Sequence, residues 1–159
     1  MFLGLEMKKA TLADTETVLE ITRDAFDRYV RKSRITSQID ALIETAEEVA
    51  NDIENSVVYI AYMFGKPAGS IRIITEDDGV ARITRFGVTS EYRRIGIGHE
   101  LMKKVDEIMQ TTRMKSAYLY TSLSNSRLIH FYKRHGYFLE SVDSKGDYPR
   151  AKLVKKFRL

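Results

Sequence analysis

The pattern of apolar and polar positions predicts four helices in this 159-residue chain. In each of them, apolar residues recur every three or four positions, as expected when one face of a helix packs against a core. The second pattern is the cleanest and continues from Ile39 to Ile53. The first follows a capping box at residues 11–14, in which Asp14 replaces the usual Glu or Gln. The helices are expected from residue 15 to the basic residues 28–34, over 36–53, over 97–109, and from the cap at 124–125 to 134.

Runs rich in β-branched and aromatic residues predict seven strands. Turn residues at 65–67 and 77–79 separate three of these strands, which favours two consecutive hairpins. The strands are expected at 5–10, 57–64, 68–75, 81–88, 117–123, 137–141 and 151–157. The order β-α-α-β-β-β-α-β-α-β-β predicts an α/β fold with helices packed on a mixed sheet. No repeat or linker is visible, so residues 1–159 are expected to form a single domain.

Composition narrows the classes of protein that fit. Hydrophobic residues make up 43% and charged residues 30% of the chain, which is ordinary for a globular domain. No apolar run reaches the length of a membrane span, and we expect no secretory signal. The absence of cysteine excludes disulfides and a cysteine nucleophile, and it fits a cytoplasmic location. The three histidines have no zinc-binding spacing, so we expect no metal.

The net charge of +4 and a pI of about 9.2 favour anionic partners. A ligand with several phosphates fits this bias, and so does weak binding to nucleic acid. The basic residues are dispersed along the chain instead of forming one stripe with aromatic residues. Nucleic acid is therefore the less favoured partner.

The most informative motif is the glycine turn at residues 93–98, Arg-Arg-Ile-Gly-Ile-Gly, between a predicted strand and a predicted helix. Glycines let the backbone approach a ligand closely, and the free N–H groups of the helix favour an anion. Together with the arginines, the turn resembles a cradle for a pyrophosphate. A Rossmann motif would need glycine at Leu101, and a P-loop would need Lys-Ser or Lys-Thr at His99–Glu100. A glycine turn without a ligand is the alternative interpretation.

The remaining pattern, Arg-x-x-Gly-x-Gly, resembles the acetyl-CoA-binding motif of the GNAT superfamily of N-acetyltransferases. The resemblance extends over residues 85–98, and Asn125 followed by residues 131–137 is similar to the second motif of that family. It implies a mostly antiparallel sheet with a splayed parallel central pair, flanked by about four helices. It also implies direct transfer of an acetyl group from acetyl-CoA, the co-substrate, to a primary amine.

The resemblance assigns the coenzyme to two backbone segments. The strand end would pair with the pantetheine arm, and the amide of Val88 would stabilise the oxyanion. The glycine turn would bind the pyrophosphate through its amides, while Asn125 is either a helix cap or a contact to the coenzyme arm. The expected coenzyme-binding residues are Phe86, Gly87, Val88, Arg93, Arg94, Ile95, Gly96, Ile97, Gly98, His99, Asn125 and Tyr132.

Tyr132 is the candidate catalytic residue. The departing thiolate needs a proton, and a phenol with a pKa near 10 can donate one. The plainer alternative is a core tyrosine, and the position of Tyr132 in the second motif favours catalysis. His130 and His135 are weaker candidates for the same role.

The general base is the point at which the sequence departs from the family. Many members carry a glutamate at the position of Arg82, and arginine cannot accept a proton. A water chain, an acid among residues 76–78, or an acceptor amine of low pKa could replace it. A catalytically silent, regulatory coenzyme-A-binding module is the alternative function.

The acceptor would lie against the first two helices and the strand before the glycine turn. The expected substrate-binding residues are Phe26, Tyr29, Arg82 and Thr84. Basic residues 31, 32 and 34 add positive charge, so we expect a small-molecule or peptide amine that also carries an anionic group. These charges could instead be solvated helix-end residues. A homodimer is compatible with this fold, and the sequence leaves the acceptor's identity open.

Overall fold

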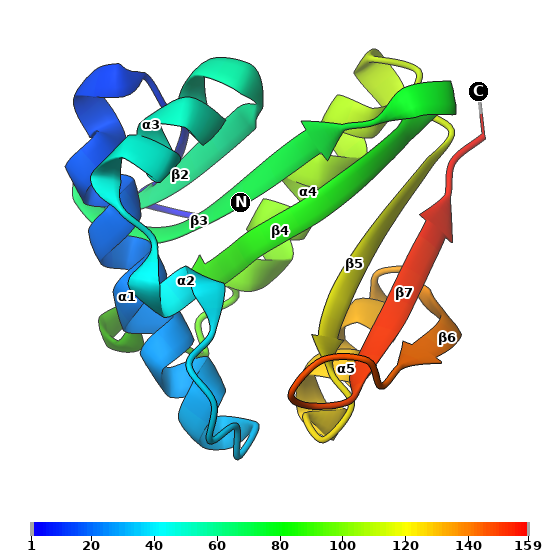
Figure 1. The fold of residues 1–159 in the computed structure, drawn as a ribbon. Coiled ribbons are helices and arrows are strands. Elements are labelled where there is room, and N and C mark those ends of the chain that lie inside the picture. The colour runs from blue at the N-terminus through cyan, green and yellow to red at the C-terminus, as the bar shows by residue number, and fades with distance from the viewer. Residues whose placement is uncertain (1, 159) are drawn as a thin grey trace.

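The computed structural model describes residues 2–158 and contains one seven-stranded sheet in the order β1-β2-β3-β4-β5-β7-β6 (Figure 1). All neighbouring strands are antiparallel except β4 and β5, which are parallel. The strands are β1 (Leu5–Lys9), β2 (Val57–Met63), β3 (Lys66–Thr75), β4 (Val80–Val88), β5 (Ser116–Ser122), β6 (Phe138–Asp143) and β7 (Arg150–Lys156). The α-helices are α1 (Thr15–Lys32), α2 (Asp40–Ile43), α3 (Ala46–Asn55), α4 (Ile97–Thr111) and α5 (Ser126–Arg134).

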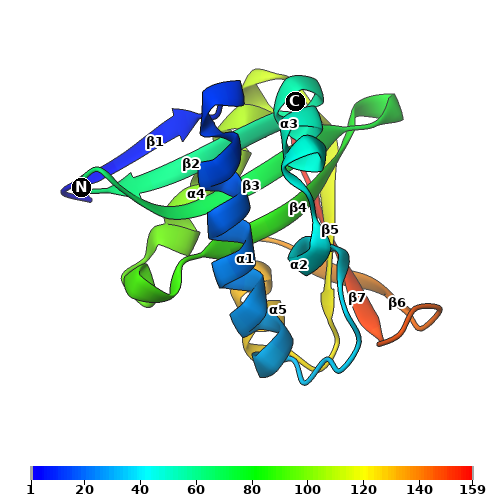
Figure 2. The ribbon, with the colours of Figure 1, turned by 60° about the vertical axis from the view of Figure 1, so that its left-hand side comes forward.

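Helices cover both faces of the sheet, with α1, α2 and α3 on one side and α4 and α5 on the other (Figure 2). Each side has its own apolar cluster of buried residues. Val18 of α1, Val49 of α3 and Ile60 of β2 belong to the first, whereas Leu101 of α4 and Leu119 of β5 belong to the second. Within residues 2–158, no helix is long and apolar enough to cross a membrane.

The predicted strands and their order are confirmed, with ends that differ by no more than two residues. The prediction of one continuous helix over residues 36–53 is wrong, because residues Glu44 and Thr45 are extended and separate α2 from α3. Thr45 caps α3 by accepting a hydrogen bond from the amide of Glu48, whose carboxylate in turn accepts one from the amide of Thr45. The fold therefore has five α-helices among its described residues, where about four were expected.

The break between α2 and α3 brings Glu44 to a buried ion cluster in the middle of the fold. Arg72 of β3 is fully buried and donates hydrogen bonds to both carboxylate oxygens of Glu44, at 2.7 and 2.8 Å. It also donates to Asp52 of α3 at 2.8 Å and to Thr22 of α1 at 3.1 Å. The cluster therefore ties α1, α3 and the α2–α3 connection to the sheet.

The same glutamate holds an irregular point of β4. Arg85 has a φ of 52°, in the left-handed region that is rare for residues other than glycine. It forms a β-bulge, because the pairing of β3 with β4 shifts between Ser70–Gly87 and Arg72–Thr84. The Arg85 Nε atom lies 3.3 Å from Glu44 Oε2, so the ion cluster stabilises the bulge.

After the third residue pair, β4 and β5 are no longer paired. Their register is Val80–Ser116, Ala81–Ala117 and Arg82–Tyr118, and no pairing of these strands continues beyond Arg82. Figure 1 shows the two strands diverging toward their C-terminal ends. The splay predicted from the family resemblance is confirmed, and the bulge at Arg85 lies within it.

Replacement of Glu44 by glutamine tests the importance of the ion cluster. Glu44→Gln keeps the side-chain shape but leaves Arg72 and Arg85 without the carboxylate between them. We expect the free energy of unfolding to fall by about 3–5 kcal/mol, as measured by urea denaturation. Glu47→Gln, at an exposed position of α3, is the control and should change it by less than about 0.5 kcal/mol. Equal effects of the two variants would contradict the role of the cluster.

Candidate active site

The end of β4 has backbone groups on its splayed edge that do not pair with β5. The amide of Thr89 donates to the carbonyl of Ala68 at 2.8 Å, so this pair is a hydrogen-bonded pair of the antiparallel ladder. Pairs alternate along such a ladder, and the next one, Gly69–Val88, is therefore not hydrogen-bonded. The N–H and C=O groups of Val88 consequently point away from β3, toward the open side.

Helix α1 lies very close to this part of β4. A Cβ atom at position 87 would overlap the Cβ of Ala25, so only glycine allows α1 to pack at this distance. Gly87 is thus required by the packing of the helix on the strand. The open edge of β4 and the side of α1 form neighbouring walls of one cleft.

This cleft, which we call the coenzyme cleft, has a volume of about 1500 Å³ and a strongly basic lining. Its walls come from α1, the end of β4, the glycine turn, the first turn of α4, and α5 with the residues before it. None of the described residues that line it is acidic. The cations that line it are Arg28, Lys32, Arg93, Arg94, Arg127 and Arg134.

The glycine turn forms the anion-binding end of the cleft. Gly96 has a φ of 97° and precedes the first residue of α4. The first hydrogen bond of the helix runs from the amide of Glu100 to the carbonyl of Gly96, so the amides of residues 97–99 precede it at the N-terminus. A Cβ atom at Gly98 would lie 3.1 Å from the Phe86 ring, so a side chain there would crowd the cleft. Free amides, the helix dipole and uncompensated arginines fit the phosphates of coenzyme A.

Most of the predicted coenzyme-binding residues come together in this cleft. Phe86, Gly87, Val88, Arg93, Arg94, Gly96, Ile97, Gly98, His99 and Asn125 all line it. Ile95 does not, because its side chain points outward and is 47% exposed. Asn125 caps α5 by accepting from the amide of Leu128 at 3.2 Å and also donates to Ser33 at 3.1 Å. The capping interpretation of Asn125 is therefore confirmed.

Two of the histidines join the first turn of α4 to the end of α5. His99 Nδ1 lies 2.7 Å from His135 Nε2, and both rings pack against Phe131. Burial, and next the proximity of His99, lower the pKa of His135. A neutral pair can share one proton across this contact, so the two rings are best explained as a link between the helices.

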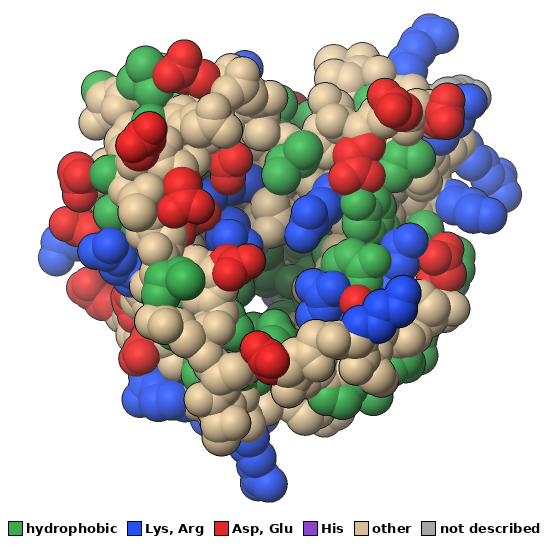
Figure 3. Space-filling model, in the orientation of Figure 1, with side chains coloured by type: hydrophobic (Ala, Val, Ile, Leu, Met, Phe, Trp, Pro, Cys, Tyr) green, Lys and Arg blue, Asp and Glu red, His purple; other side chains and the backbone are tan. Residues whose placement is uncertain are grey.

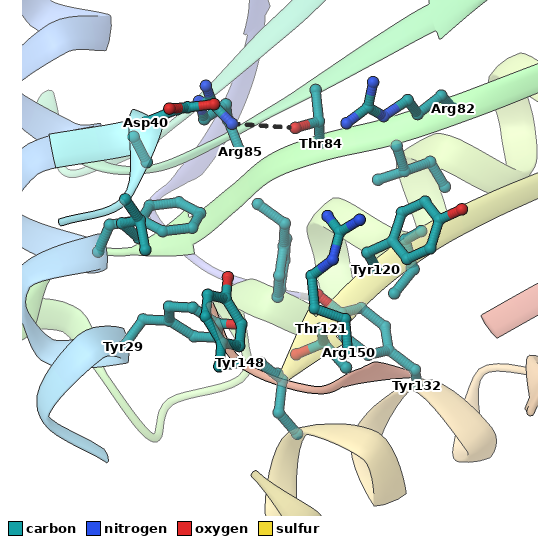
Figure 4. A pocket seen from close by; sticks show the side chains of 17 residues that line it. Tyr29, Asp40, Arg82, Thr84, Arg85, Tyr120, Thr121, Tyr132, Tyr148 and Arg150 are labelled. Atoms are coloured by element: carbon teal, nitrogen blue, oxygen red, sulfur yellow. Dashed lines mark hydrogen bonds between the residues drawn. The ribbon is translucent and has the colours of Figure 1, made fainter. Parts of the chain in front are cut away.

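A second, smaller pocket lies at the other side of the splay (Figure 4). Its volume is about 170 Å³, which suits the head group of a small acceptor better than a whole drug-sized ligand. The view in Figure 3 shows a hollow in the middle of this face, with Lys and Arg side chains on its walls. The predicted substrate residues Phe26, Tyr29, Arg82 and Thr84 all line this acceptor pocket. Tyr132 lines it as well and does not line the coenzyme cleft.

Three arginines line the acceptor pocket, but two of them have ionic partners. Arg85 lies 3.3 Å from Glu44, and Arg150 lies 2.8 Å from Asp143 and stacks on the Tyr120 ring. Arg82 has no ion pair with any residue that the structure describes. It is therefore the cation of this pocket that is best able to bind an anionic group.

The hairpin acids considered as substitutes for the missing base do not line this pocket. Both carboxylate oxygens of Glu76 lie 2.8 Å from the Tyr118 hydroxyl. Burial, with the Glu76 hydrogen bond, raises the pKa of Tyr118 to about 12. Among the described lining residues, Asp40 at the start of α2 is the one acid.

Tyr132 is 5% exposed and has aromatic neighbours on several sides. Its ring packs edge-on against Phe86, Phe131 and Tyr137. Burial raises the pKa of the Tyr132 phenol, so the group stays protonated across the physiological range. The phenol therefore keeps its proton, and its raised pKa makes it a weaker acid than an exposed phenol.

Sequence reasoning missed several residues of the two sites. Tyr120, Tyr148 and Arg150 line the acceptor pocket from β5, the β6–β7 connection and β7, which reach it only through the sheet order. Asp40 lies in the region predicted as uninterrupted helix, and no local signal marked it. Lys32, expected near the acceptor, instead lines the coenzyme cleft. Burial raises the pKa of Tyr148 to about 12, beside Tyr29.

Comparisons with known proteins agree with this geometry. The acetyltransferase (GNAT) family model matches residues 16–137. Spermidine N(1)-acetyltransferase from Thermoplasma acidophilum is 24% identical over 152 residues, which cover 89% of this chain and 92% of that protein. Streptothricin acetyltransferase A from Bacillus subtilis is 26% identical over 106 residues, and this match covers 65% of this chain and only 61% of that protein.

The fold has solved counterparts. The crystal structure of the PaiA N-acetyltransferase from Thermoplasma acidophilum, in complex with coenzyme A, aligns with a TM-score of 0.84. The alignment covers 98% of this chain and all of that one, at 22% sequence identity. The family model covers most of the chain, and both family motifs lie on the walls of one cleft. The chain therefore belongs to the GNAT family of acetyltransferases.

Proposed function

We propose that this protein is an N-acetyltransferase, formed as one domain, that moves an acetyl group from acetyl-CoA directly to a primary amine. The observation that carries the proposal is the open edge of β4, which leads from an acid-free, arginine-rich cleft to a separate pocket. The two sites meet at Phe86, which lines both. A thioester held in the cleft would thus face an amine held in the pocket. The cysteine-free composition is compatible with work in the cytoplasm, which we propose as its location.

Backbone amides at the end of β4 would stabilise charge during the reaction. Bound acetyl-CoA would supply the acetyl thioester, whose carbonyl oxygen becomes negative as the amine attacks. The open-edge orientation of Val88 supports its amide as the hydrogen-bond donor to that oxygen.

Tyr132 would supply the proton that the departing sulfur needs. Its buried, neutral phenol comes from α5, and its ring packs on Phe86 at the junction of the two sites. Arg82 cannot take the proton that the amine loses. As the one acid among the described pocket residues, Asp40 is our candidate for that role.

The acceptor is proposed to be a small-molecule or peptide amine that carries an anionic group. Arg82 supports this choice, since its charge has no ionic partner among the described residues. A similar protein is named for spermidine, which carries only positive charges at neutral pH. Spermidine would be repelled by Arg82, although Asp40 could attract one of its amines, and it is the second candidate acceptor.

Addition of acetyl-CoA should stabilise the folded protein. Ligand at about 100 times its Kd adds about 2.7 kcal/mol, which corresponds to a rise in Tm of about 5–10 °C for a chain of this size. Thermal unfolding with acetyl-CoA, and with ATP and ADP as control nucleotides, measures this effect. Absence of any rise with acetyl-CoA, or an equal rise with ATP, would contradict the coenzyme assignment.

Replacement of Tyr132 by phenylalanine should slow catalysis without weakening coenzyme binding. We expect kcat to fall by about 100-fold, because the variant keeps the ring but loses the proton donor. Coenzyme release in the presence of the best acceptor gives the rate. Tyr137→Phe is the matched control, since it removes a buried hydroxyl that has no partner among the described residues. Binding without turnover in the wild type, unchanged in Tyr132→Phe, would favour the silent coenzyme-binding module.

The acceptor preference can be tested with a panel of amines. We expect amines with a carboxylate or phosphate to exceed spermidine in kcat/KM by at least about tenfold. Arg82→Gln should lower kcat/KM for the anionic amines by about tenfold and leave spermidine unchanged or improved. Arg113→Gln, at an exposed site outside the pocket, serves as the control. Spermidine turnover that matches the anionic amines would refute the preference.

A further inference from the structure

Arg28 of α1 is a half-buried cation of the coenzyme cleft that the sequence motifs do not include. Its Nη2 atom lies 3.4 Å from the carbonyl oxygen of Val88, on the open edge of β4. Its Nη1 atom is buried and has no hydrogen-bond partner in residues 2–158. A buried donor without an acceptor is costly, so such a group commonly marks a place that a ligand or water completes.

The surroundings of Arg28 carry more positive than negative charge. Burial, and next the proximity of Arg93, lower the pKa of Arg28. Asp24 acts in the opposite direction, and Arg31 and Arg94 lower the pKa further. Asp24, one turn earlier on α1, is the acid whose charge acts on Arg28. Both of its carboxylate oxygens accept hydrogen bonds from Ser90, one from the amide at 3.1 Å and one from the hydroxyl at 2.6 Å. Both carboxylate oxygens of Asp24 are therefore hydrogen-bonded to Ser90, in the loop before the glycine turn.

Three guanidinium groups thus converge from two walls of the cleft. Arg93 and Arg94 belong to the glycine turn, whereas Arg28 belongs to α1, which lines the same cleft. Guanidinium groups bind phosphate oxygens with two parallel hydrogen bonds, and an anion with several oxygens suits three neighbouring guanidinium groups. The Nη1 donor of Arg28 is the part of this cluster that still needs an acceptor.

We infer that Arg28 binds the diphosphate of coenzyme A from the α1 wall of the cleft, beside the glycine turn. This inference rests on the proposed function, and it adds a second, side-chain-based contact to the amide cradle of the turn. Because Nη2 contacts Val88, the bound diphosphate would also fix the position of α1 against the end of β4.

The position of α1 gives this contact a further consequence. Phe26 and Tyr29, the neighbours of Arg28 along the helix, line the acceptor pocket. One helix therefore carries a wall of each site, and binding of the diphosphate to Arg28 would set the position of the acceptor wall. The acceptor is then expected to bind more tightly after the coenzyme than before it.

Binding of coenzyme A and of pantetheine, which lacks every phosphate, tests the assignment. In isothermal titration calorimetry, we expect Arg28→Gln to lower the affinity for coenzyme A by about ten- to a hundredfold. This is the range for a lost charge-assisted hydrogen bond. Pantetheine affinity, measured by competition or NMR, should change by less than about twofold. Arg28→Gln should weaken the binding of dephospho-coenzyme A as much as that of coenzyme A, because both ligands carry the diphosphate.

Two further variants complete the experiment. Arg28→Lys keeps the charge but cannot donate two parallel hydrogen bonds, so its loss of affinity for coenzyme A should be intermediate. If Arg28→Gln does not fold, Arg28→Lys replaces it. Arg31→Gln removes an exposed arginine of the same helix that pairs with Asp27, and it should leave the affinity nearly unchanged.

The outcomes separate this inference from the proposed function. No binding of coenzyme A to the wild type would refute the proposed function itself. With normal wild-type binding, an unchanged affinity in the Arg28 variants would overturn the inference. Equal losses for pantetheine and coenzyme A would overturn it too, because Arg28 would then act through β4 instead of the phosphates. If Arg31→Gln weakened the binding of coenzyme A as much as Arg28→Gln does, the effect would come from the overall positive charge of α1 and not from a contact of Arg28.

Discussion

The contact between Glu44 and two arginines is the interaction on which the site depends. Arg72 anchors Glu44 in the core, and Glu44 in turn holds Arg85 in the left-handed conformation that forms the bulge of β4. Beyond Arg82, β4 has left β5, and its edge groups no longer pair with that strand. An unpaired edge inside a sheet is normally avoided. Here the unpaired edge supplies the amides that the reaction needs, at the cost of a buried ionic cluster.

The two sites on either side of this splay differ in the charge of their lining residues. The coenzyme cleft collects six arginine and lysine residues without an acid among its described lining residues, which suits a ligand with several phosphates. The acceptor pocket has ionic partners for Arg85 and Arg150 and includes Asp40. Acidic side chains therefore offset most of the positive charge of this pocket, and Arg82 is the exception. A polyphosphate should be drawn to the first site, and a small amine with an acidic group to the second.

Much of the fold and the coenzyme cleft could be predicted from the sequence because their signals are local. The glycine turn, the strand before it and the cap at Asn125 each lie within a few residues, and their spacing fixes their relation. The splay itself was expected only from the family resemblance, since nothing in the residues 82–88 reveals that pairing with β5 ends there.

The acceptor pocket was less predictable because its walls come from distant segments. Arg150 and Tyr148 approach Tyr29 only after β7 is inserted between β5 and β6. The break at Glu44 was hidden because apolar residues continue at helical spacing through it. The overlooked sign was the pair Thr45 and Glu48, a capping box inside an apparently continuous helix. Burial of Arg72, which requires Glu44 to turn inward, could not be inferred from its own strand.

A crystal structure of the complex with coenzyme A tests the central claim, that the open edge of β4 binds the thioester arm, most directly. The account predicts that the pantetheine chain lies between β4 and β5 like an added strand, with its polar groups about 3 Å from the backbone of Phe86 and Val88. A coenzyme bound elsewhere, or β4 and β5 paired along their whole length in the complex, would contradict it.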